Sequence, residues 1–263
     1  MAERVLVTGG ARRLGAAICE AFARAGWHVV CQYRDSSAEA TALCSALNAA
    51  GWVATAIQSE LGTPTQRQDL VRAIARDHGP LTCVVNNASS FEPDTGADFT
   101  QAGLSDLLTS NLVAPLALGQ LLAIQEMPGD TVDRCVIHIL DQKVYNLNPD
   151  YFSYTVSKLA LERAVGLQAQ ALAPRVRVCG IAPGLMYLSG PQTEANFAQA
   201  AAANLMRRPT DPADVARACV FLANTRSVTG TTLCIDNGQH LVPLPRDIMF
   251  VVDDLLKAND PWP

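Results

Sequence analysis

The stretch "RVLVTGGARRLGAAICEAF", Arg4 to Phe22, indicates the fold class, because an apolar run leads into a glycine-rich turn and then into a segment of helical periodicity. Gly9 and Gly10 permit the turn, and Gly15 permits close packing of the helix against the strand. Such a turn can place a pyrophosphate at the helix N-terminus. A tight strand–helix turn that binds no ligand would look similar, so the turn alone does not establish a cofactor.

Short apolar runs and longer helical segments continue to alternate along the chain. The alternation predicts a single Rossmann-type α/β domain over residues 1–263, a doubly wound parallel sheet of about seven strands with helices on both faces. We expect the strands at 4–8, 28–33, 53–58, 82–86, 135–140, 177–181 and 232–235. We expect the helices at about 13–25, 36–50, 64–78, 103–126, 151–173 and 211–223.

Two segments depart from this alternation. Residues 184–210 begin with Gly and Pro and then become alanine-rich, which predicts a substrate loop with a short helix rather than a core element. A loop after the carboxyl end of a strand is a plausible lid over a site. The tail, 241–263, contains four prolines and is expected either to cross to a neighbouring subunit or to lie on the surface.

Composition argues against several kinds of partner. The net charge is −5 and the arginines are scattered, so a nucleic-acid surface is not expected. The eight cysteines form no C-x-x-C pair and mostly fall in apolar segments, which suggests a reducing cytoplasm. The N-terminus resembles no signal peptide, and no apolar run reaches the roughly 18 residues of a membrane span. The four histidines lack metal-ligand spacing, so no metal is expected.

The chain resembles the short-chain dehydrogenase/reductase superfamily, whose opening turn is T-G-x-x-x-G-x-G. Arg13 stands in place of the middle glycine. The resemblance extends over nearly the whole chain, in the family's order, through "NNAS" at 86–89, Asn111, Tyr154 with Lys158, and "APG" at 182–184. It implies a catalytic set in which Asn111 and Lys158 support Tyr154.

Tyr154 and Lys158 are four residues apart and therefore share one face of the expected helix. The ammonium group should favour the phenolate and so lower the pKa of Tyr154, which helps proton exchange near neutral pH. The resemblance adds that Lys158 holds the nicotinamide ribose. The plain alternative is a tyrosine packed beneath a solvated lysine, which is a common arrangement on helices.

Asp141 lies where most of the superfamily has a serine that donates a hydrogen bond to a substrate carbonyl. A carboxylate only accepts, and unless protonated it would repel a developing oxyanion. It suits a ring with N–H donors, or a ring nitrogen that must receive a proton. The branch with aspartate here is the pteridine reductases, including dihydromonapterin reductases and, as an alternative, dihydrofolate reductases. "NNASSF", ending at Phe91, and "PGLMYL", Pro183 to Leu188, resemble segments of that branch.

In that branch the phenylalanine at Phe91 stacks on the pterin, and the arginine at Arg13 reaches cofactor phosphate and pterin. Phe91 could instead be a core aromatic, although it follows a strand at the expected mouth of the sheet. The resemblance implies a substrate site made by the following residues: Arg13, Ser89, Phe91, Asp141, Tyr154 and Leu185.

The choice of nicotinamide cofactor depends on charge near the adenosine ribose. Asp35 is about 20 residues beyond the glycines, a spacing that favours NAD. In the family, however, the NAD-selecting acid occupies the place of Tyr33, and Arg34 follows it. Arg12 and Arg34 together could clamp a 2′-phosphate, so we expect NADPH, with Asp35 as the counterargument.

The resemblance also places Glu60 at the aspartate that bonds the adenine amine. The whole expected cofactor site comprises Gly9, Arg12, Arg13, Leu14, Gly15, Tyr33, Arg34, Glu60, Leu61, Asn87, Ala88, Ser89, Tyr154, Lys158, Pro183 and Gly184.

These expectations define an NADPH-dependent reductase that transfers hydride to a C=N bond of a dihydropterin, dihydromonapterin or dihydrofolate-like ring. A short-chain carbonyl reductase of the 3-oxoacyl-thioester or polyol type is the alternative, and a non-catalytic NADPH sensor is a third. The apolar helix "LSDLLTSNLVAPLALGQLLAI" and the family resemblance predict a homo-oligomer, usually a tetramer.

Overall fold

The computed structural model describes residues 3–126, 133–188 and 192–258, and for 255–258 the backbone alone. Positions 189–191 of the expected substrate loop and 259–263 of the tail lie outside the described residues.

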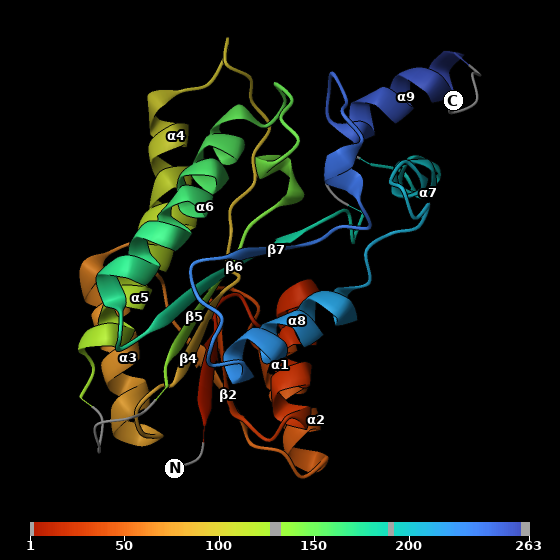
Figure 1. The fold of residues 1–263 in the computed structure, drawn as a ribbon. Helices are drawn as coiled ribbons and strands as arrows, with labels where there is room; N and C mark the ends of the chain where they lie inside the picture. Colours follow the sequence, from red (N-terminus) through yellow and green to blue (C-terminus); the bar gives the residue numbers. More distant parts are fainter. Residues whose placement is uncertain (1–2, 127–132, 189–191, 259–263) are drawn as a thin grey trace.

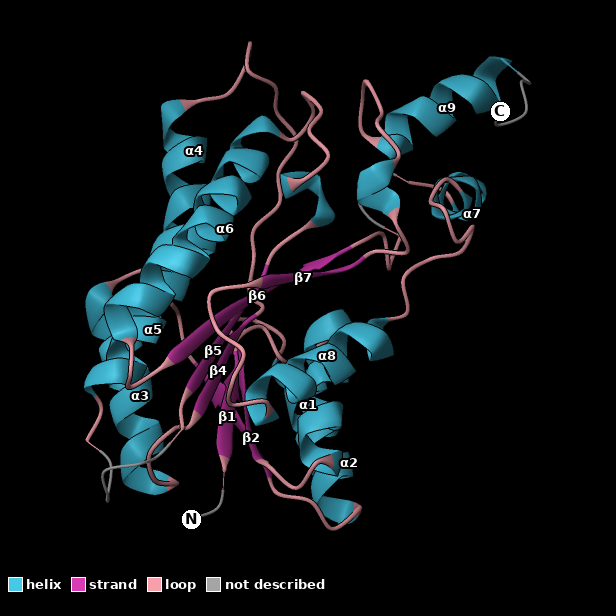
Figure 2. Ribbon diagram, in the orientation of Figure 1, coloured by secondary structure: helices cyan, strands magenta, loops and turns pink. Residues whose placement is uncertain are grey.

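Seven parallel strands form one sheet, in the order β3-β2-β1-β4-β5-β6-β7 (Figure 2). The strands are β1 (Arg4–Val7), β2 (His28–Tyr33), β3 (Ala54–Gln58), β4 (Cys83–Asn86), β5 (Cys135–Ile139), β6 (Arg177–Pro183) and β7 (Thr232–Ile235). This confirms the predicted doubly wound sheet. Strand ends differ from the prediction by one or two residues, most visibly in β6, which continues through Pro183.

Helices cover both faces of the sheet (Figure 1). One face carries α1 (Arg13–Arg24), α2 (Ser37–Ala49) and α8 (Pro212–Asn224). The other carries α3 (Pro64–Asp77), α4 (Gln101–Leu108), α5 (Ala114–Ile124) and α6 (Phe152–Leu172). Side chains alternate along each strand, so Val5 and Val7 enter the core on the α1 side while Leu6 enters the core on the α3 side.

The helix predicted at 103–126 is continuous from Gln101 to Ile124 but contains a π-turn at Thr109–Val113. Asn111 lies in this turn and is 1% exposed. Within the described residues this helix is long and apolar enough, by length and composition, to cross a membrane, although polar residues interrupt its apolar sequence. In the fold, Leu118 and Leu122 of α5 are buried in the core, as expected of a core helix of a globular domain.

The predicted substrate loop contains a short helix, α7 (Glu194–Ala202), as expected. The tail differs from the prediction. It forms α9 (Ile248–Ala258), which packs against α7 and buries Ile248 and Val252 beside Ala200. This part of the tail is therefore not a loose surface segment, because Ile248 and Val252 are buried within the same chain.

The strand order reverses between the neighbouring strands β1 and β4, so the connections that follow them pass to opposite faces of the sheet and leave a crevice at its carboxyl edge. The loops that follow β1, β4, β5 and β6 all open at this edge, and α7 and α9 lie beyond it (Figure 1). The candidate site is built there.

Candidate active site

The glycine-rich turn after β1 has a backbone that requires small residues. Gly9 has φ +60°, and a Cβ on Gly15 would lie 2.1 Å from the Gly9 carbonyl oxygen. Arg13, at the position of the family's middle glycine, also adopts a left-handed conformation, with φ 51°. The arginine thus adopts a conformation that glycine adopts more readily than other residues. Its guanidinium donates to the Leu188 carbonyl and lies over the ring of Tyr187, 5.3 Å from the centroid.

The loop after β4 is fastened to this turn by Thr8. The backbone N–H groups of Asn87 and Ala88 each donate to Thr8 Oγ1 at 3.0 Å. Asn87 Nδ2 returns a bond of 3.1 Å to the Gly9 carbonyl. These contacts fix the distance between the turn after β1 and the loop after β4, the two sides of the crevice in which a dinucleotide would bind.

A cavity of about 760 Å³ lies over this turn; we call it the nucleotide cavity. Most of the expected cofactor residues line it: Gly9, Arg12, Arg13, Leu14, Gly15, Arg34, Glu60, Leu61, Asn87, Ala88 and Ser89. Tyr33 lies beside it and its hydroxyl is bonded to Ser37 Oγ at 3.4 Å. Sequence reasoning had not singled out Gln32, whose Oε1 accepts from the Gly9 N–H at 2.9 Å and fixes the turn.

Both arginines that were expected at the ribose are paired with acids. Arg34 Nε lies 2.6 Å from Asp35 Oδ2, and Arg12 lies 3.5 Å from Glu39. The Arg34 side chain is 64% exposed, so its pairing with Asp35 is weak and readily exchanged for another anion.

A second cavity of about 360 Å³, the reaction pocket, shares Arg13, Leu14, Asn87, Ser89 and Tyr187 with the first. It brings together side chains from the ends of four strands and from the tail. Of the expected residues it contains Phe91, Asp141, Tyr154, Lys158, Pro183, Gly184 and Leu185. Residues 158 positions apart in sequence, Ser89 and Asp247, thus line one pocket.

Asp141 and Tyr154 are directly bonded. Tyr154 Oη donates to Asp141 Oδ2 at 2.9 Å, and the Lys143 backbone N–H donates to Asp141 Oδ1 at 2.8 Å. Lys158 Nζ donates to the Ile139 carbonyl at 2.8 Å and lies 5.7 Å from the centroid of the Tyr154 ring. The phenol therefore has a carboxylate as its hydrogen-bond partner, with the ammonium group behind the ring.

The electrostatics differ from the prediction that Lys158 lowers the pKa of Tyr154. Burial raises the pKa of Tyr154 well above 10, and the nearby Asp141 carboxylate raises it further. Loss of hydration likewise raises the pKa of Asp141, and burial lowers the pKa of Lys158 to about 8. The prediction was wrong because burial has the largest effect and the nearest charge is negative.

Asn111 does not line either cavity. Its Nδ2 donates to Ser157 Oγ at 3.0 Å and to the Ser90 carbonyl at 2.9 Å, while its Oδ1 accepts from the Ser90 N–H at 2.8 Å. It therefore joins the loop after β4 to α6 from behind the pocket. Asn111 is the buried residue of the π-turn Thr109–Val113. Single π-turns inside α-helices often occur at functional sites.

Phe91 lies at the pocket mouth in an aromatic cluster. Its ring is stacked on Tyr151, with centroids 4.2 Å apart, and meets the ring of Tyr154 edge-on at 4.6 Å. Tyr151 is 5% exposed and has φ 55° at the start of α6. Sequence reasoning assigned Tyr151 no role; its position three residues before Tyr154 was the available signal.

Other pocket residues were missed because they come from unpatterned segments. The turn after β5 contributes Gln142 and Lys143, and the tail contributes Asp247, Ile248 and Met249. The prolines of the tail do not indicate which part of the fold it packs against, so its contribution to the pocket could not be predicted. Across the described ranges, the histidine, cysteine and acidic side chains form no group of three that could hold a metal ion.

Comparison with known proteins gives consistent relatives. A family model described as enoyl-(acyl carrier protein) reductase matches residues 9–240. An uncharacterized oxidoreductase of Mycobacterium tuberculosis is 34% identical over 239 residues, covering 89% of this chain and 90% of the relative. Pteridine reductase 1 of Leishmania tarentolae is 29% identical, and dihydromonapterin reductase of Klebsiella pneumoniae is 25% identical; each comparison covers 90% of this chain and 96% of the relative.

A solved structure is similar over the same range. FolM alternative dihydrofolate reductase 1 from Brucella canis, complexed with NADP, has a TM-score of 0.86 and 36% sequence identity. The similarity covers 91% of this chain and 94% of that one.

Proposed function

Because the chain belongs to the short-chain dehydrogenase/reductase superfamily, we propose that it is an NADPH-dependent reductase of a pteridine ring, acting on a C=N bond. The observation that supports this substrate is the bond between Tyr154 and Asp141, 2.9 Å long, at the position where a carbonyl reductase needs a neutral donor.

The nucleotide cavity suits the cofactor. Gly9 and Gly15 are packed so closely that Cβ atoms there would meet Ala88 at 3.1 Å and the Gly9 oxygen at 2.1 Å, so only glycine permits this tight turn before α1, at whose N-terminus a pyrophosphate would bind. Arg12 and Arg34 would hold a 2′-phosphate by exchanging Glu39 and Asp35 for it. NADPH, when bound, supplies the hydride.

Tyr154 is the proton donor in this proposal. Its raised pKa keeps the phenol protonated at neutral pH, so a proton is available at Oη. Lys158, with a pKa of about 8, is mostly cationic at pH 7 and offsets the charge left on the phenolate. Asp141 orients the hydroxyl and accepts from N–H groups of the ring.

Phe91 and Arg13 would hold the ring. Phe91 is 42% exposed, which leaves part of its surface available for stacking beside the face that Tyr151 covers. Arg13 lines both cavities and so can reach cofactor phosphate and substrate. Ser89 and Leu185 complete the proposed substrate contacts.

The two other candidates fit less well. A 3-oxoacyl-thioester or polyol reductase would need a donor at position 141, where this chain has an acceptor. A non-catalytic NADPH sensor has no use for a tyrosine and lysine arranged beside the pocket, and both are present.

We also propose a cytoplasmic homotetramer. Large apolar side chains are exposed on the helices that the family uses for assembly, including Val113, Ile124 and Leu167, which are 45%, 64% and 68% exposed. The free cysteines, of which all but Cys234 are buried, suit a reducing compartment.

Steady-state assays with NADPH against dihydropterins, dihydrofolate and simple ketones test the proposed function. We expect turnover of at least one dihydropterin. Reduction of ketones but of no pterin would assign the chain to the carbonyl reductases, and NADPH binding without turnover would favour the sensor.

A further inference from the structure

The tail provides one wall of the reaction pocket. Asp247, Ile248 and Met249 line it together with Gln142 and Lys143 from the turn after β5. The family model ends its match at residue 240, so this wall is partly made by a segment beyond the matched region.

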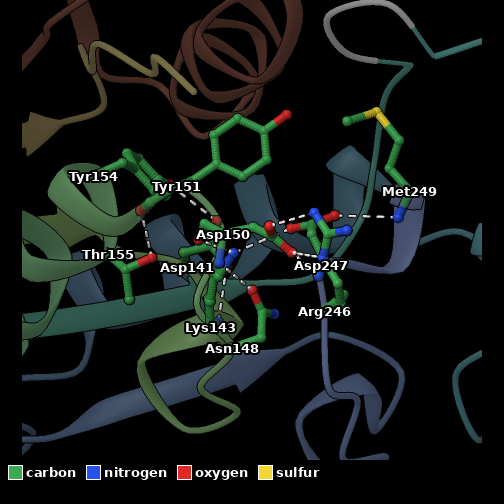
Figure 3. Close-up of polar contacts among 10 residues, drawn as sticks. All are labelled: Asp141, Lys143, Asn148, Asp150, Tyr151, Tyr154, Thr155, Arg246, Asp247 and Met249. Atoms are coloured by element: carbon green, nitrogen blue, oxygen red, sulfur yellow. Dashed lines mark hydrogen bonds and ion pairs between the residues drawn. The ribbon is translucent and has the colours of Figure 1, made fainter. Parts of the chain in front are cut away.

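The carboxylate of Asp247 is held in place from two sides (Figure 3). Its Oδ2 accepts from Lys143 Nζ at 3.2 Å, and its Oδ1 accepts from the Met249 N–H at 3.2 Å. The Asp247 N–H donates to Asp150 Oδ2 at 2.8 Å. Each carboxylate oxygen has a second lone-pair direction, so both can still accept from a ligand.

The neighbouring cations are already committed to partners. Lys143 Nζ also donates to the Asp150 carbonyl at 2.8 Å, and its side chain is 4% exposed. Arg246 binds the Asp150 carboxylate through Nε at 3.1 Å and Nη2 at 2.7 Å. Among the described residues of this wall, neither cation is left free to bind an anion.

Gln142 adds a second acceptor. The residue is 9% exposed and lines the same pocket, and its Oε1 is buried with no hydrogen-bond partner in the described parts of the chain. A buried amide oxygen without a donor is costly and uncommon, so its pairing with a ligand donor would explain it.

We propose that Gln142 and Asp247 form a subsite that accepts hydrogen bonds from a neutral, hydroxyl-bearing side chain on the reduced ring. The proposal rests on the proposed pteridine reductase function and names the substituent that the pocket selects. An anionic side chain would be disfavoured there, because Gln142 Oε1 and the Asp247 carboxylate are both hydrogen-bond acceptors. A cationic one meets the Lys143 ammonium group, which already occupies Asp247 Oδ2. A neutral hydroxyl donor suits both residues.

A purely structural role for Asp247 is the alternative, because its carboxylate also caps the first turn of α9. Asp247→Asn separates the two roles: asparagine is an equally good cap but has neither the charge nor the second carboxylate oxygen. Gln142 is not a helix cap, so Gln142→Met tests the subsite separately: methionine has a similar length and shape but lacks the unpaired amide oxygen. Asp254→Asn removes an exposed acid from the same helix, outside the pocket, as a matched control.

The experiment measures kcat/KM with NADPH for three substrates that share the dihydropterin ring. They are 6-trihydroxypropyl-dihydropterin, 6-methyl-dihydropterin and dihydrofolate, which has an anionic tail. We expect the wild type to prefer the hydroxylated substrate to the methyl one by about 10- to 100-fold, the scale of one or two hydrogen bonds, with dihydrofolate no better than the methyl compound. Each pocket variant should reduce this preference about tenfold, mainly through KM, with the 6-methyl value within about twofold of wild type. Asp254→Asn should keep the full preference.

The outcomes are distinguishable. Equal losses on the hydroxylated and methyl substrates would mean that the variants disturb the pocket as a whole, and would overturn the subsite. Equal kcat/KM of the wild type on the hydroxylated and methyl substrates would also overturn the subsite, but it would leave the proposed function intact. A wild type that reduces none of the three would overturn the proposed function and the subsite with it. NADPH fluorescence titration and melting curves establish that each variant is folded, and Gln142→Met tests the subsite even if Asp247→Asn is unstable.

Discussion

Tyr154 and Asp141 form a hydrogen-bonded acid pair: the phenol donates to the carboxylate at 2.9 Å, and the pKa values of both groups are raised by burial. The Asp141 carboxylate holds the phenolic O–H, and the raised pKa of Tyr154 keeps that proton on the phenol, where it is available to the pocket. This relationship, more than either residue alone, distinguishes the pocket from that of an enzyme with a serine at position 141.

Asp141→Ser should lower kcat/KM for dihydropterin about 10²- to 10⁴-fold, because the reduction of a C=N bond needs a positioned proton donor and the carboxylate that orients the Tyr154 phenol is lost. Tyr154→Phe should be at least as damaging. Affinity for NADPH, measured by fluorescence titration, should be nearly unchanged in Asp141→Ser, and activity on a simple ketone should improve because serine donates where a carboxylate accepts. Undiminished pterin reduction by Asp141→Ser would make Asp141 a structural acid at a strand end.

The activity should fall at alkaline pH. Lys158 is cationic below its pKa of about 8, so kcat/KM should drop about tenfold per unit as the pH rises above that value. A pH profile from 6 to 9.5 measures this. Lys158→Arg, weaker overall, should lack the alkaline fall because a guanidinium keeps its charge. A wild-type profile that stays flat to pH 9.5 would contradict the role of the ammonium group.

NADPH should be preferred to NADH by one to two orders of magnitude in kcat/KM, the scale of one or two charge-assisted phosphate contacts. The double variant Arg12→Gln/Arg34→Gln should bring the ratio close to one. Arg72→Gln is the control, since Arg72 is 73% exposed, is paired with Asp69 within α3 and does not line the nucleotide cavity. A wild-type preference for NADH would show that Asp35 governs the ribose.

Gly15→Ala should damage folding and cofactor binding together. The added Cβ would lie 2.1 Å from the Gly9 oxygen, so the turn must move, at a cost of about 2 kcal/mol in the free energy of unfolding. NADPH affinity should fall at least tenfold, about 1.4 kcal/mol. Gly96→Ala meets its nearest neighbour at 3.7 Å and should change neither the denaturant midpoint nor the affinity.

The exposed face of α6 tests the proposed assembly. Leu167→Glu places a charge at a side chain that is 68% exposed in the single chain, so it should dissociate the tetramer with little effect on the fold. Sedimentation velocity at micromolar concentration measures the change. Glu194, on α7, serves as the control through Glu194→Gln. A wild-type protein that sediments as a monomer would remove the idea.

The fold followed from the sequence because its elements are locally marked. The run Val5–Val7 is apolar and is followed by Thr8 and two glycines, and equivalent apolar runs recur at intervals that fit one helix each. Parallel strands buried on both faces need continuous apolar sequence, so few other architectures fit. The π-turn at Asn111 left no such mark, because its residues are as helix-compatible as their neighbours.

The chemistry of the site was predictable in identity but not in energetics. Tyr154, Lys158 and Asp141 were found from spacing and resemblance, and the structure brings all three to one pocket. The direction of the Tyr154 pKa shift could not be predicted from the sequence, since the depth of burial and the charges around the phenol depend on the packed structure. Asp247 was missed for a related reason: 106 residues separate it from Asp141, and only the docking of α9 brings them together.

The wall that Asp247, Ile248 and Met249 add to the reaction pocket lies beyond the segment that the family model matches, and this affects how substrate range can evolve. The residues that we propose to bind NADPH and to donate the proton all precede residue 240, while Asp247 follows it. A tail with a different residue at this position would be anchored through the same Asp150 and Asn196 contacts, and could change which side chain the pocket admits without disturbing the sheet, the cofactor turn or the acid pair.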